Sequence, residues 1–220
     1  MISALVFDFD GVLADSEPLH LAATQDVLAS IGAALPREEY YADYLGYDDA
    51  GMFRALSDAR GWGLTSGQIA TLIAEKAIAL EAIISGTDVL YPSTAECIRR
   101  LAADWPLGIA SGAFRHEIEA ILRRGGIDRY FKFIVGAGDT PESKPQPGPY
   151  RRAAQLHGAD PGSCLAIEDS RFGIESAKSA GLWCVGITTT YPVSELMAAD
   201  AIVTSLDELT PELIRSLGTG

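Results

Sequence analysis

The spacing of apolar residues divides the chain into an all-helical segment and a segment in which strands and helices alternate. An apolar run at residues 4–7, with a β-branched and an aromatic residue, predicts a buried strand. From about residue 17 to residue 85 the helical period then continues without a strand between the helices. Helices are expected at residues 16–31, 37–45, 48–60 and 66–84. This block reads as a helical domain inserted after the first strand.

The pattern changes near Tyr91, where short apolar runs begin to alternate with helical periods. Strands are expected at residues 107–110, 131–135, 164–167 and 184–187, helices at 92–103, 115–124, 147–157 and 174–180, and short elements of unspecified type around 201–203 and 211–217. Such alternation is typical of a parallel sheet. We therefore expect an α/β fold, with a Rossmann-like parallel-sheet core of residues 1–16 and 86–220 and an inserted all-helical domain of residues 17–85.

Length, composition and net charge narrow the classes of protein to which this chain could belong. A chain of 220 residues accommodates a core with a smaller insert, and 48% apolar residues with 22 glycines suit a globular α/β protein. The net charge of −13 argues against a protein that binds the nucleic-acid backbone, because such proteins need a basic face. A small phosphorylated ligand remains compatible, since a few cations and a metal ion can reverse the field inside a cleft.

The cysteines and the N-terminal residues bear on location. Cys97, Cys164 and Cys184 are odd in number and lack the spacing of a metal site, so we expect free thiols in a reducing cytoplasm. Asp8 and Asp10 interrupt the apolar stretch near the N-terminus, so we expect no signal peptide, and no apolar run of about 18 residues predicts a membrane span. We expect a cytoplasmic monomer, with a dimer as the alternative.

Polar residues directly follow three of the predicted strands. They are Asp8 and Asp10 after residues 4–7, Ser111 and Gly112 after residues 107–110, and Glu168 and Asp169 after residues 164–167. The carboxyl ends of parallel strands share one edge of a sheet, where α/β proteins bind ligands, so we expect these groups to converge. Gly11 would let the backbone approach a ligand closely. The alternative is that Asp8 and Asp10 only cap a strand and bind water.

Carboxylates gathered at that edge require a cation. At an effective dielectric constant near 20, two like charges 4 Å apart repel by roughly 4 kcal/mol. An all-oxygen site suits Mg²⁺, which binds one or two carboxylates, retains waters and accepts a phosphate oxygen. These residues therefore predict a magnesium site.

Two further stretches could bind an anion such as phosphate. Lys144 lies in a proline-rich loop, where a fixed ammonium could hold a phosphate; the alternative is an ordinary solvated lysine. Ser111 and the backbone N–H groups of Gly112 and Ala113 lie at a strand-to-helix turn, which is a natural seat for an anion. The alternative there is a plain turn that caps a helix.

Taken together, these residues resemble the motifs of the haloacid dehalogenase superfamily of phosphotransferases. That family combines an acid-x-acid-glycine motif, a serine or threonine at a strand end, a loop lysine and a final acidic pair. The matching residues, in the same order along the chain, are Asp8-Phe9-Asp10-Gly11, Ser111, Lys144 and Glu168-Asp169. The helical insert, with residues 15–20 before and at its start, is similar to the small cap domain of the β-phosphoglucomutase-like branch.

The resemblance implies a role for each of these residues. Asp8 would be the nucleophile that forms an aspartyl-phosphate, and Asp10 would be the general acid and then the general base. Members that cleave carbon–halogen or carbon–phosphorus bonds lack the second acid, so Asp10 points to phosphate esters. The groups that would bind the phosphoryl group are Gly11, Ser111, Gly112, Ala113 and Lys144. The groups that would hold Mg²⁺ are Asp8, the carbonyl oxygen of Asp10, Asp169 and Glu168, the last directly or through water.

By the same resemblance, the helical insert would decide the substrate. His20 and Lys76 occupy positions where the mutase places substrate-handling groups, although both also fit ordinary residues of a solvated helix surface. Where the mutase has an arginine for the distal phosphate of a bisphosphate, this chain has Tyr47-Asp48-Asp49. Arg115 is the candidate substitute for that arginine.

These observations favour a Mg²⁺-dependent phosphatase that hydrolyses a small phosphorylated metabolite, a sugar phosphate, through an aspartyl-phosphate. A phosphosugar mutase of the β-phosphoglucomutase type is the alternative, because it shares the core residues. A catalytically silent protein that binds a phosphorylated metabolite is a third hypothesis. It is less well supported, since none of the core residues is missing.

Overall fold

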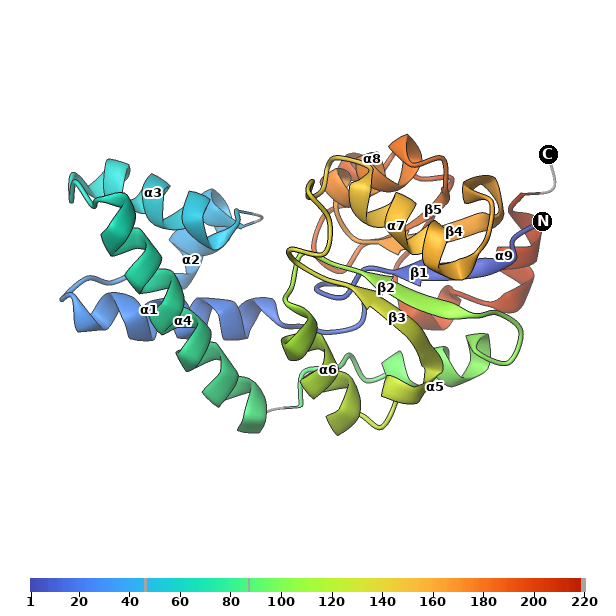
Figure 1. The fold of residues 1–220 in the computed structure, drawn as a ribbon, viewed down its shortest axis with the longest axis horizontal. Helices are drawn as coiled ribbons and strands as arrows, with labels where there is room; N and C mark the ends of the chain where they lie inside the picture. Colours follow the sequence, from blue (N-terminus) through green and yellow to red (C-terminus); the bar gives the residue numbers. More distant parts are fainter. Residues whose placement is uncertain (46, 87, 219–220) are drawn as a thin grey trace. The chain divides into compact units, whose positions relative to one another are not determined.

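The computed structural model of this chain describes residues 1–45, 47–86 and 88–218 (Figure 1). It contains two compact units, one formed by Met1–Asp15 with Asp88–Gly220 and the other by Ser16–Thr87. We call them the core unit and the helical unit. Each contains its own cluster of buried apolar side chains.

The core unit is built on a six-stranded sheet. The strands are β1 (Ala4–Phe7), β2 (Leu107–Ala110), β3 (Phe131–Val135), β4 (Cys164–Glu168), β5 (Trp183–Ile187) and β6 (Ala201–Val203). They are ordered β3-β2-β1-β4-β5-β6, and neighbouring strands are parallel. The predicted α/β fold with a parallel sheet is therefore confirmed, and β1 lies between β2 and β4.

The register of the sheet aligns the ends of its three central strands. Phe7 of β1 pairs with Ile109 of β2 and with Ile167 of β4. The backbone N–H of Asp8 continues this ladder by donating to the carbonyl oxygen of Ile167 at 2.9 Å. The residues of β1, β2 and β4 are buried, as expected for strands that helices cover on both faces. The residues that follow these strands therefore emerge at one edge of the sheet.

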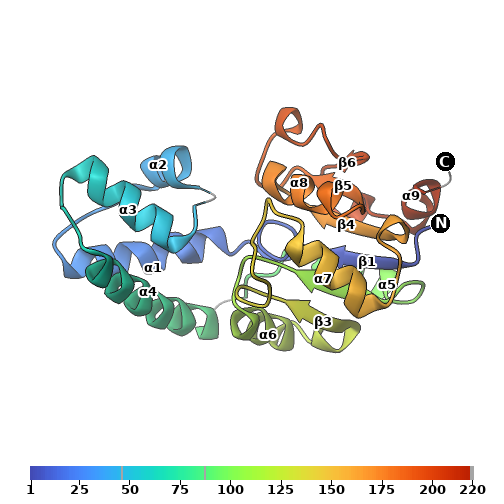
Figure 2. The ribbon, with the colours of Figure 1, turned by 45° about the horizontal axis from the view of Figure 1, so that its top comes forward.

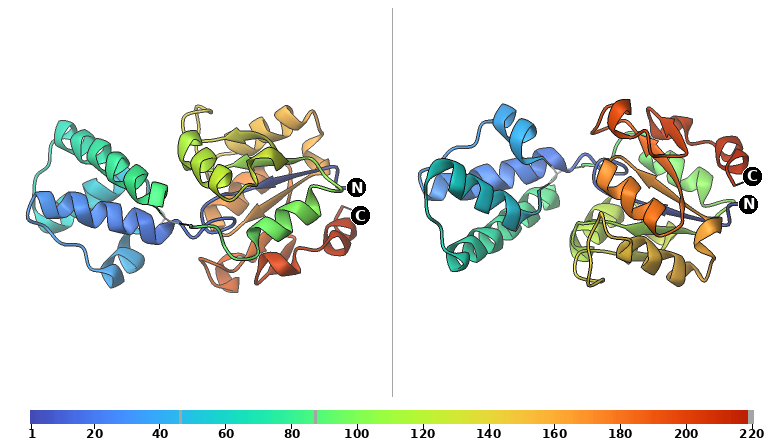
Figure 3. Two further views of the ribbon diagram at one scale, coloured as in Figure 1. Left: turned by 90° about the horizontal axis from the view of Figure 1, so that it is seen from below. Right: turned by 90° about the horizontal axis from the view of Figure 1, so that it is seen from above.

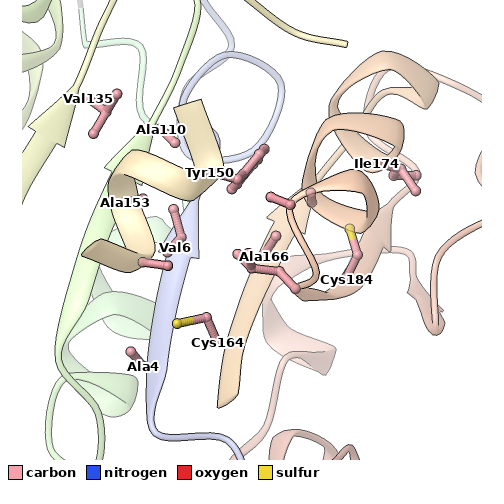
Figure 4. Close-up of a cluster of buried hydrophobic side chains, with 14 of the residues drawn as sticks. Ala4, Val6, Ala110, Val135, Tyr150, Ala153, Cys164, Ala166, Ile174 and Cys184 are labelled. Atoms are coloured by element: carbon pink, nitrogen blue, oxygen red, sulfur yellow. The ribbon is translucent and has the colours of Figure 1, made fainter. Parts of the chain in front are cut away.

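Helices lie on both faces of this sheet (Figure 2; Figure 3). α7 (Gly148–His157) and α8 (Arg171–Ser179) cover one face, and α5 (Thr94–Leu101) and α6 (Arg115–Arg124) cover the other. The remaining helices of the core unit are α9 (Pro211–Ser216) and the 3-10 helices Asp128–Tyr130, Pro161–Ser163, Val193–Glu195 and Leu206–Glu208. Between α7, α8 and the sheet lies a buried cluster in which Tyr150 is the largest side chain (Figure 4).

The described residues of the helical unit form α1 (Glu17–Ser30), α2 (Arg37–Glu39), a π-helix at Tyr40–Tyr44, α3 (Asp49–Arg60) and α4 (Ser66–Gly86). α1 packs along α4, and the unit's buried side chains include Leu28, Phe53 and Leu72. The expected helix at residues 37–45 is therefore an α-helical turn followed by a π-helical one. The N–H of Leu45 donates to the Tyr40 carbonyl oxygen at 3.0 Å, the i to i+5 bond that defines a π-helix.

Two helices, α8 and α5, begin more than one residue away from where they were expected. α8 begins at Arg171 rather than at residue 174, because the Ser170 hydroxyl caps it by accepting from the Gly173 N–H at 3.1 Å. α5 begins at Thr94 rather than at residue 92, because Tyr91 first closes a turn in which its carbonyl oxygen accepts from the Thr94 N–H at 3.0 Å. Over the described ranges, no helix has both the length and the apolar character that crossing a membrane requires.

Candidate active site

Three carboxylates meet where β1 and β4 end. Asp8 follows β1, Glu168 is the last residue of β4, and Asp169 comes next. Their exposed fractions are 8%, 0% and 6%, and their carboxylate oxygens lie within 4.8 Å of one another. The parallel register of β1 and β4 thus brings together acids that are some 160 positions apart, as the strand-end pattern predicted.

Lys144 reaches this cluster from the loop between β3 and α7. Its Nζ lies 2.9 Å from Oδ1 of Asp8 and 2.6 Å from Oε1 of Glu168, and its side chain is only 13% exposed. The alternative of an ordinary solvated lysine is therefore wrong. Burial by itself would lower the pKa of the Lys144 ammonium, but the carboxylates of Asp8 and Glu168 outweigh it and raise that pKa. Lys144 consequently stays charged beside the acids.

One lysine does not balance this many carboxylates. Burial raises the pKa of Asp8 well above its usual value, and the nearby charges of Glu168, Asp169 and Asp10 add to the rise. Burial likewise raises the pKa of Asp169 to about 7, with the Glu168 carboxylate as the next cause. A divalent cation fits such a set of close, hard oxygen donors and would relieve their mutual repulsion.

Glu168 is held by hydrogen-bond donors from three segments. Its Oε1 accepts from Lys144 Nζ at 2.6 Å and from the Tyr150 hydroxyl at 2.8 Å. Its Oε2 accepts from the backbone N–H of Ser170 at 3.3 Å and from the Ser170 hydroxyl at 3.1 Å. Gly173 of α8 leaves the space, because a Cβ there would lie 1.8 Å from Cδ of Glu168. Tyr150, Ser170 and Gly173 were not anticipated from the sequence.

Gly11 follows the second acid in a tight turn after β1. Its N–H donates to the Ala14 carbonyl oxygen at 2.9 Å, and its φ of +73° is readily adopted by glycine. A Cβ there would lie 1.9 Å from Oδ2 of Asp169 and 2.5 Å from Oγ1 of Thr190. The role of Gly11 visible in the structure is therefore to admit Asp169 and Thr190 beside the turn.

Two threonines at this edge were missed by the sequence analysis. Thr189 donates its hydroxyl to the Gly11 carbonyl oxygen, and a hydrogen bond from Thr190 opposes the rise in the pKa of Asp169. Both follow β5, at the same edge as the acids. The hydroxyl run at residues 188–190, directly after a predicted strand, is the signal that could have revealed them.

In the turn after β2, the side chain of Ser111 accepts a hydrogen bond from the backbone of the same turn. Ser111 is 4% exposed, its N–H donates to the Val135 carbonyl oxygen at 2.9 Å, and its Oγ accepts from the N–H of Ala113 at 3.1 Å. An anion bound here would therefore have to replace that bond to reach the Ala113 amide. Gly112 faces open space, since a Cβ there would meet nothing within 4 Å.

The two remaining candidate cations, Arg115 and Lys76, form ion pairs with carboxylates. Arg115, the first residue of α6, pairs with Asp139 at 2.7 Å. Within the helical unit, Lys76 is only 2% exposed, forms an ion pair with Asp49 and lies 3.5 Å from Nδ1 of His20. The interpretation of Lys76 as a solvated surface residue is therefore wrong. Lys76 thus offsets the charge of Asp49, which lies in the stretch that replaces the arginine of the mutase.

Known proteins resemble the chain over most of its length. A family model described as haloacid dehalogenase-like hydrolase matches residues 2–181. Hexitol phosphatase B of Escherichia coli (strain K12) is 30% identical over 213 residues, which cover 95% of this chain and 95% of that protein. Phosphoglycolate phosphatase of the same strain is 30% identical over 234 residues, covering 96% of this chain and 92% of that protein.

A solved structure is also similar to this chain over most of its length. The crystal structure of CbbY from Rhodobacter sphaeroides in complex with phosphate has a TM-score of 0.83 and 28% sequence identity to this chain. The match covers 95% of this chain and 96% of that one. The similarity therefore extends beyond the core motifs to both units of the fold.

Proposed function

The chain belongs to the haloacid dehalogenase-like hydrolases, as its motifs indicated, and we propose that it is a Mg²⁺-dependent phosphatase of a small phosphorylated metabolite. The observation that carries this proposal is the position of Lys144, which contacts Asp8 and Glu168 within the carboxylate cluster. Two relatives of similar length are a hexitol phosphatase and a phosphoglycolate phosphatase. They support a sugar phosphate or a related small phosphate ester as the substrate class.

In this proposal Asp8 is the nucleophile. One of its carboxylate oxygens attacks phosphorus, the bond between phosphorus and the ester oxygen breaks, and an aspartyl-phosphate forms. Asp10 donates the proton that the leaving alcohol needs, and then removes a proton from the water that attacks the aspartyl-phosphate. Phosphate leaves and the Asp8 carboxylate is restored. Lys144, 2.9 Å from Asp8, would neutralise charge on the transferring group.

The proposed metal site consists of Asp8, Asp169 and the carbonyl oxygen of Asp10. When bound, Mg²⁺ supplies positive charge to the phosphoryl oxygens. Both oxygens of Glu168 already accept hydrogen bonds from Lys144, Tyr150 or Ser170. We therefore propose that Glu168 holds Lys144 in place and that any interaction between Glu168 and the metal passes through water.

A phosphosugar mutase is the alternative that uses the same core residues. A mutase must retain a bisphosphate while the intermediate reorients, and this retention requires a cation for the distal phosphate. The two candidates named from the sequence are already paired, Arg115 with Asp139 and Lys76 with Asp49. This pairing favours hydrolysis. A silent metabolite-binding protein would have no use for the general acid Asp10.

The test is a panel of phosphate esters, including hexitol phosphates, phosphoglycolate and β-glucose 1-phosphate. Free phosphate and isomerised sugar phosphate are measured in Mg²⁺ and in excess chelator. We expect steady phosphate release in Mg²⁺ only. Conversion of β-glucose 1-phosphate to glucose 6-phosphate faster than phosphate appears would establish the mutase instead. Binding of esters without turnover would establish the silent binding protein.

We also propose that the protein works as a monomer in the cytoplasm. Cys97, Cys164 and Cys184 are free and buried, which suits a reducing compartment. Size-exclusion chromatography with light scattering would test the oligomeric state, and a dimer is the outcome that contradicts it.

A further inference from the structure

Tyr150 is a buried tyrosine whose hydroxyl reaches the candidate active site. It extends from α7 into the cluster that α7 and α8 form with the sheet (Figure 4), and it is fully buried. Its hydroxyl donates to Oε1 of Glu168 at 2.8 Å. Burial, followed by the charges of Glu168 and Asp8, raises the pKa of Tyr150 well above its usual value, so the hydroxyl keeps its proton and remains a donor.

The same tyrosine also touches the lysine that Glu168 holds. The ammonium of Lys144 lies 5.1 Å from the centre of the Tyr150 ring, within the range of a cation–π contact. Lys144 donates to the same Oε1 atom that accepts from Tyr150 and also contacts Asp8. A continuous set of contacts therefore runs from the Tyr150 hydroxyl through Glu168 to Lys144 and then to Asp8.

We propose that Tyr150 is a positioning residue that orients Glu168, so that Glu168 holds the Lys144 ammonium in place to bind the phosphoryl group. The inference rests on the proposed function, in which Lys144 contacts that group. Tyr150 itself does not touch the reacting atoms in this scheme. It acts by fixing the plane of the Glu168 carboxylate.

The geometry explains why one hydroxyl can have this effect. Ser170 binds only Oε2 of Glu168, so by itself it permits the carboxylate to rotate about that end. The hydroxyl of Tyr150 at Oε1 removes this freedom and leaves the second lone pair of that atom directed at Lys144. A phenylalanine at position 150 would keep the buried ring and its contact with the ammonium, and would lose only this restraint.

The test compares Tyr150→Phe with Tyr40→Phe. Tyr40 is a matched control, because it is also a buried tyrosine whose hydroxyl donates to a carboxylate, that of Glu17 in the helical unit. Binding of inorganic phosphate is measured by calorimetry in Mg²⁺, together with kcat and KM on the best ester of the panel. Half-saturation by Mg²⁺ and the melting temperature are measured for each variant.

For Tyr150→Phe we expect phosphate affinity and kcat/KM to fall about tenfold, the size of losing one hydrogen bond to a charged group, with Mg²⁺ half-saturation unchanged. Tyr40→Phe should lose comparable stability and keep wild-type phosphate affinity. In a Lys144→Ala background, Tyr150→Phe should cause no further loss of phosphate affinity, because the residue through which it acts is absent.

Phosphate affinity and kcat/KM of Tyr150→Phe within about twofold of wild type, below the effect of such a bond, would overturn the inference. A full additional loss in the Lys144→Ala background would do the same, since Tyr150 would then act independently of the lysine. Failure of the proposed function gives a different result: the wild-type protein itself would release no phosphate. Calorimetry with phosphate would still report the effect of Tyr150, because it requires no turnover.

Discussion

The ammonium of Lys144 lies 2.9 Å from the carboxylate of Asp8, and both side chains are largely buried. Asp8 directly follows the first strand of the chain, whereas Lys144 comes from the loop between β3 and α7. The pair places a cation against the proposed nucleophile before any substrate binds. It also partly offsets the charge of an acidic cluster that burial disfavours. The stability of the protein and its proposed chemistry therefore depend on the same contact.

Replacing Lys144 should impair both properties. Lys144→Met should reduce phosphate release by about 10²–10³-fold, as the loss of an electrostatic contact to the transition state does. The metal-free variant should also melt at a lower temperature, because the cluster loses its cation. The control is Lys178→Met, since Lys178 forms an exposed pair with Asp200 at 2.7 Å. That pair should contribute about 1 kcal/mol or less, without an effect on turnover. Equal behaviour of the two variants would contradict the role given to Lys144.

The two acids of the first motif should differ in their effects. Asp8→Asn should abolish phosphate release, because an amide cannot form the acyl phosphate. Asp10→Asn should slow it by about 10²–10⁴-fold, the usual loss when a general acid is removed. Mass spectrometry after rapid acid quenching should detect phosphorylated protein in Asp10→Asn and none in Asp8→Asn. Near-normal turnover of Asp8→Asn would refute the covalent mechanism.

Metal binding should stabilise the protein more at high pH than at low pH. The pKa of Asp169 is raised to about 7 in the folded protein, and that of Asp8 is raised too. An acid whose pKa is higher when folded than when unfolded weakens folding above its folded pKa, and this loss fades as the pH falls toward the unfolded value. Without metal, the contribution of Asp169 to stability should therefore decline from about pH 4 to about pH 7, and Asp8 should change stability in the same direction.

Melting temperatures with Mg²⁺ and with chelator, measured across that range, test this dependence. The increase caused by Mg²⁺ should grow with pH, because the cation replaces protons on the cluster. Asp169→Asn should reduce the increase at every pH. An increase that is the same at both ends of the range would mean that the acidic cluster does not take up the metal.

The space that Gly173 leaves beside Glu168 should be as important for activity as the hydrogen bonds of Glu168. Gly173→Ala would place a Cβ 1.8 Å from Cδ of Glu168, so the carboxylate or helix α8 must move. We expect reduced stability and a loss of phosphate release. Gly67→Ala in α4 is the control, since its Cβ would meet only Oγ1 of Thr65 at 4.0 Å. It should stabilise the protein by up to about 1 kcal/mol through helix propensity. A fully active Gly173→Ala would show that the position of Glu168 is not critical.

The sequence by itself predicted the central strands of the sheet and the polar residues that follow them. The strands at residues 4–7, 107–110 and 131–135 have the predicted bounds, because a buried strand is a local run of apolar residues. The shared edge of a parallel sheet then predicted that Asp8, Glu168 and Asp169 would meet, and motif order indicated the family.

Only the tertiary structure decided which side chains are partners. Nothing in the spacing of residues 150 and 168 indicates that a tyrosine of α7 donates to the carboxylate at the end of β4. The ion pair of Lys76 with Asp49 and that of Arg115 with Asp139 were equally hidden, and both changed the interpretation of a candidate cation. The physical reason is range: helical and strand periods arise from neighbours along the chain, whereas a hydrogen bond or an ion pair requires contact between elements that only packing brings within about 3 Å.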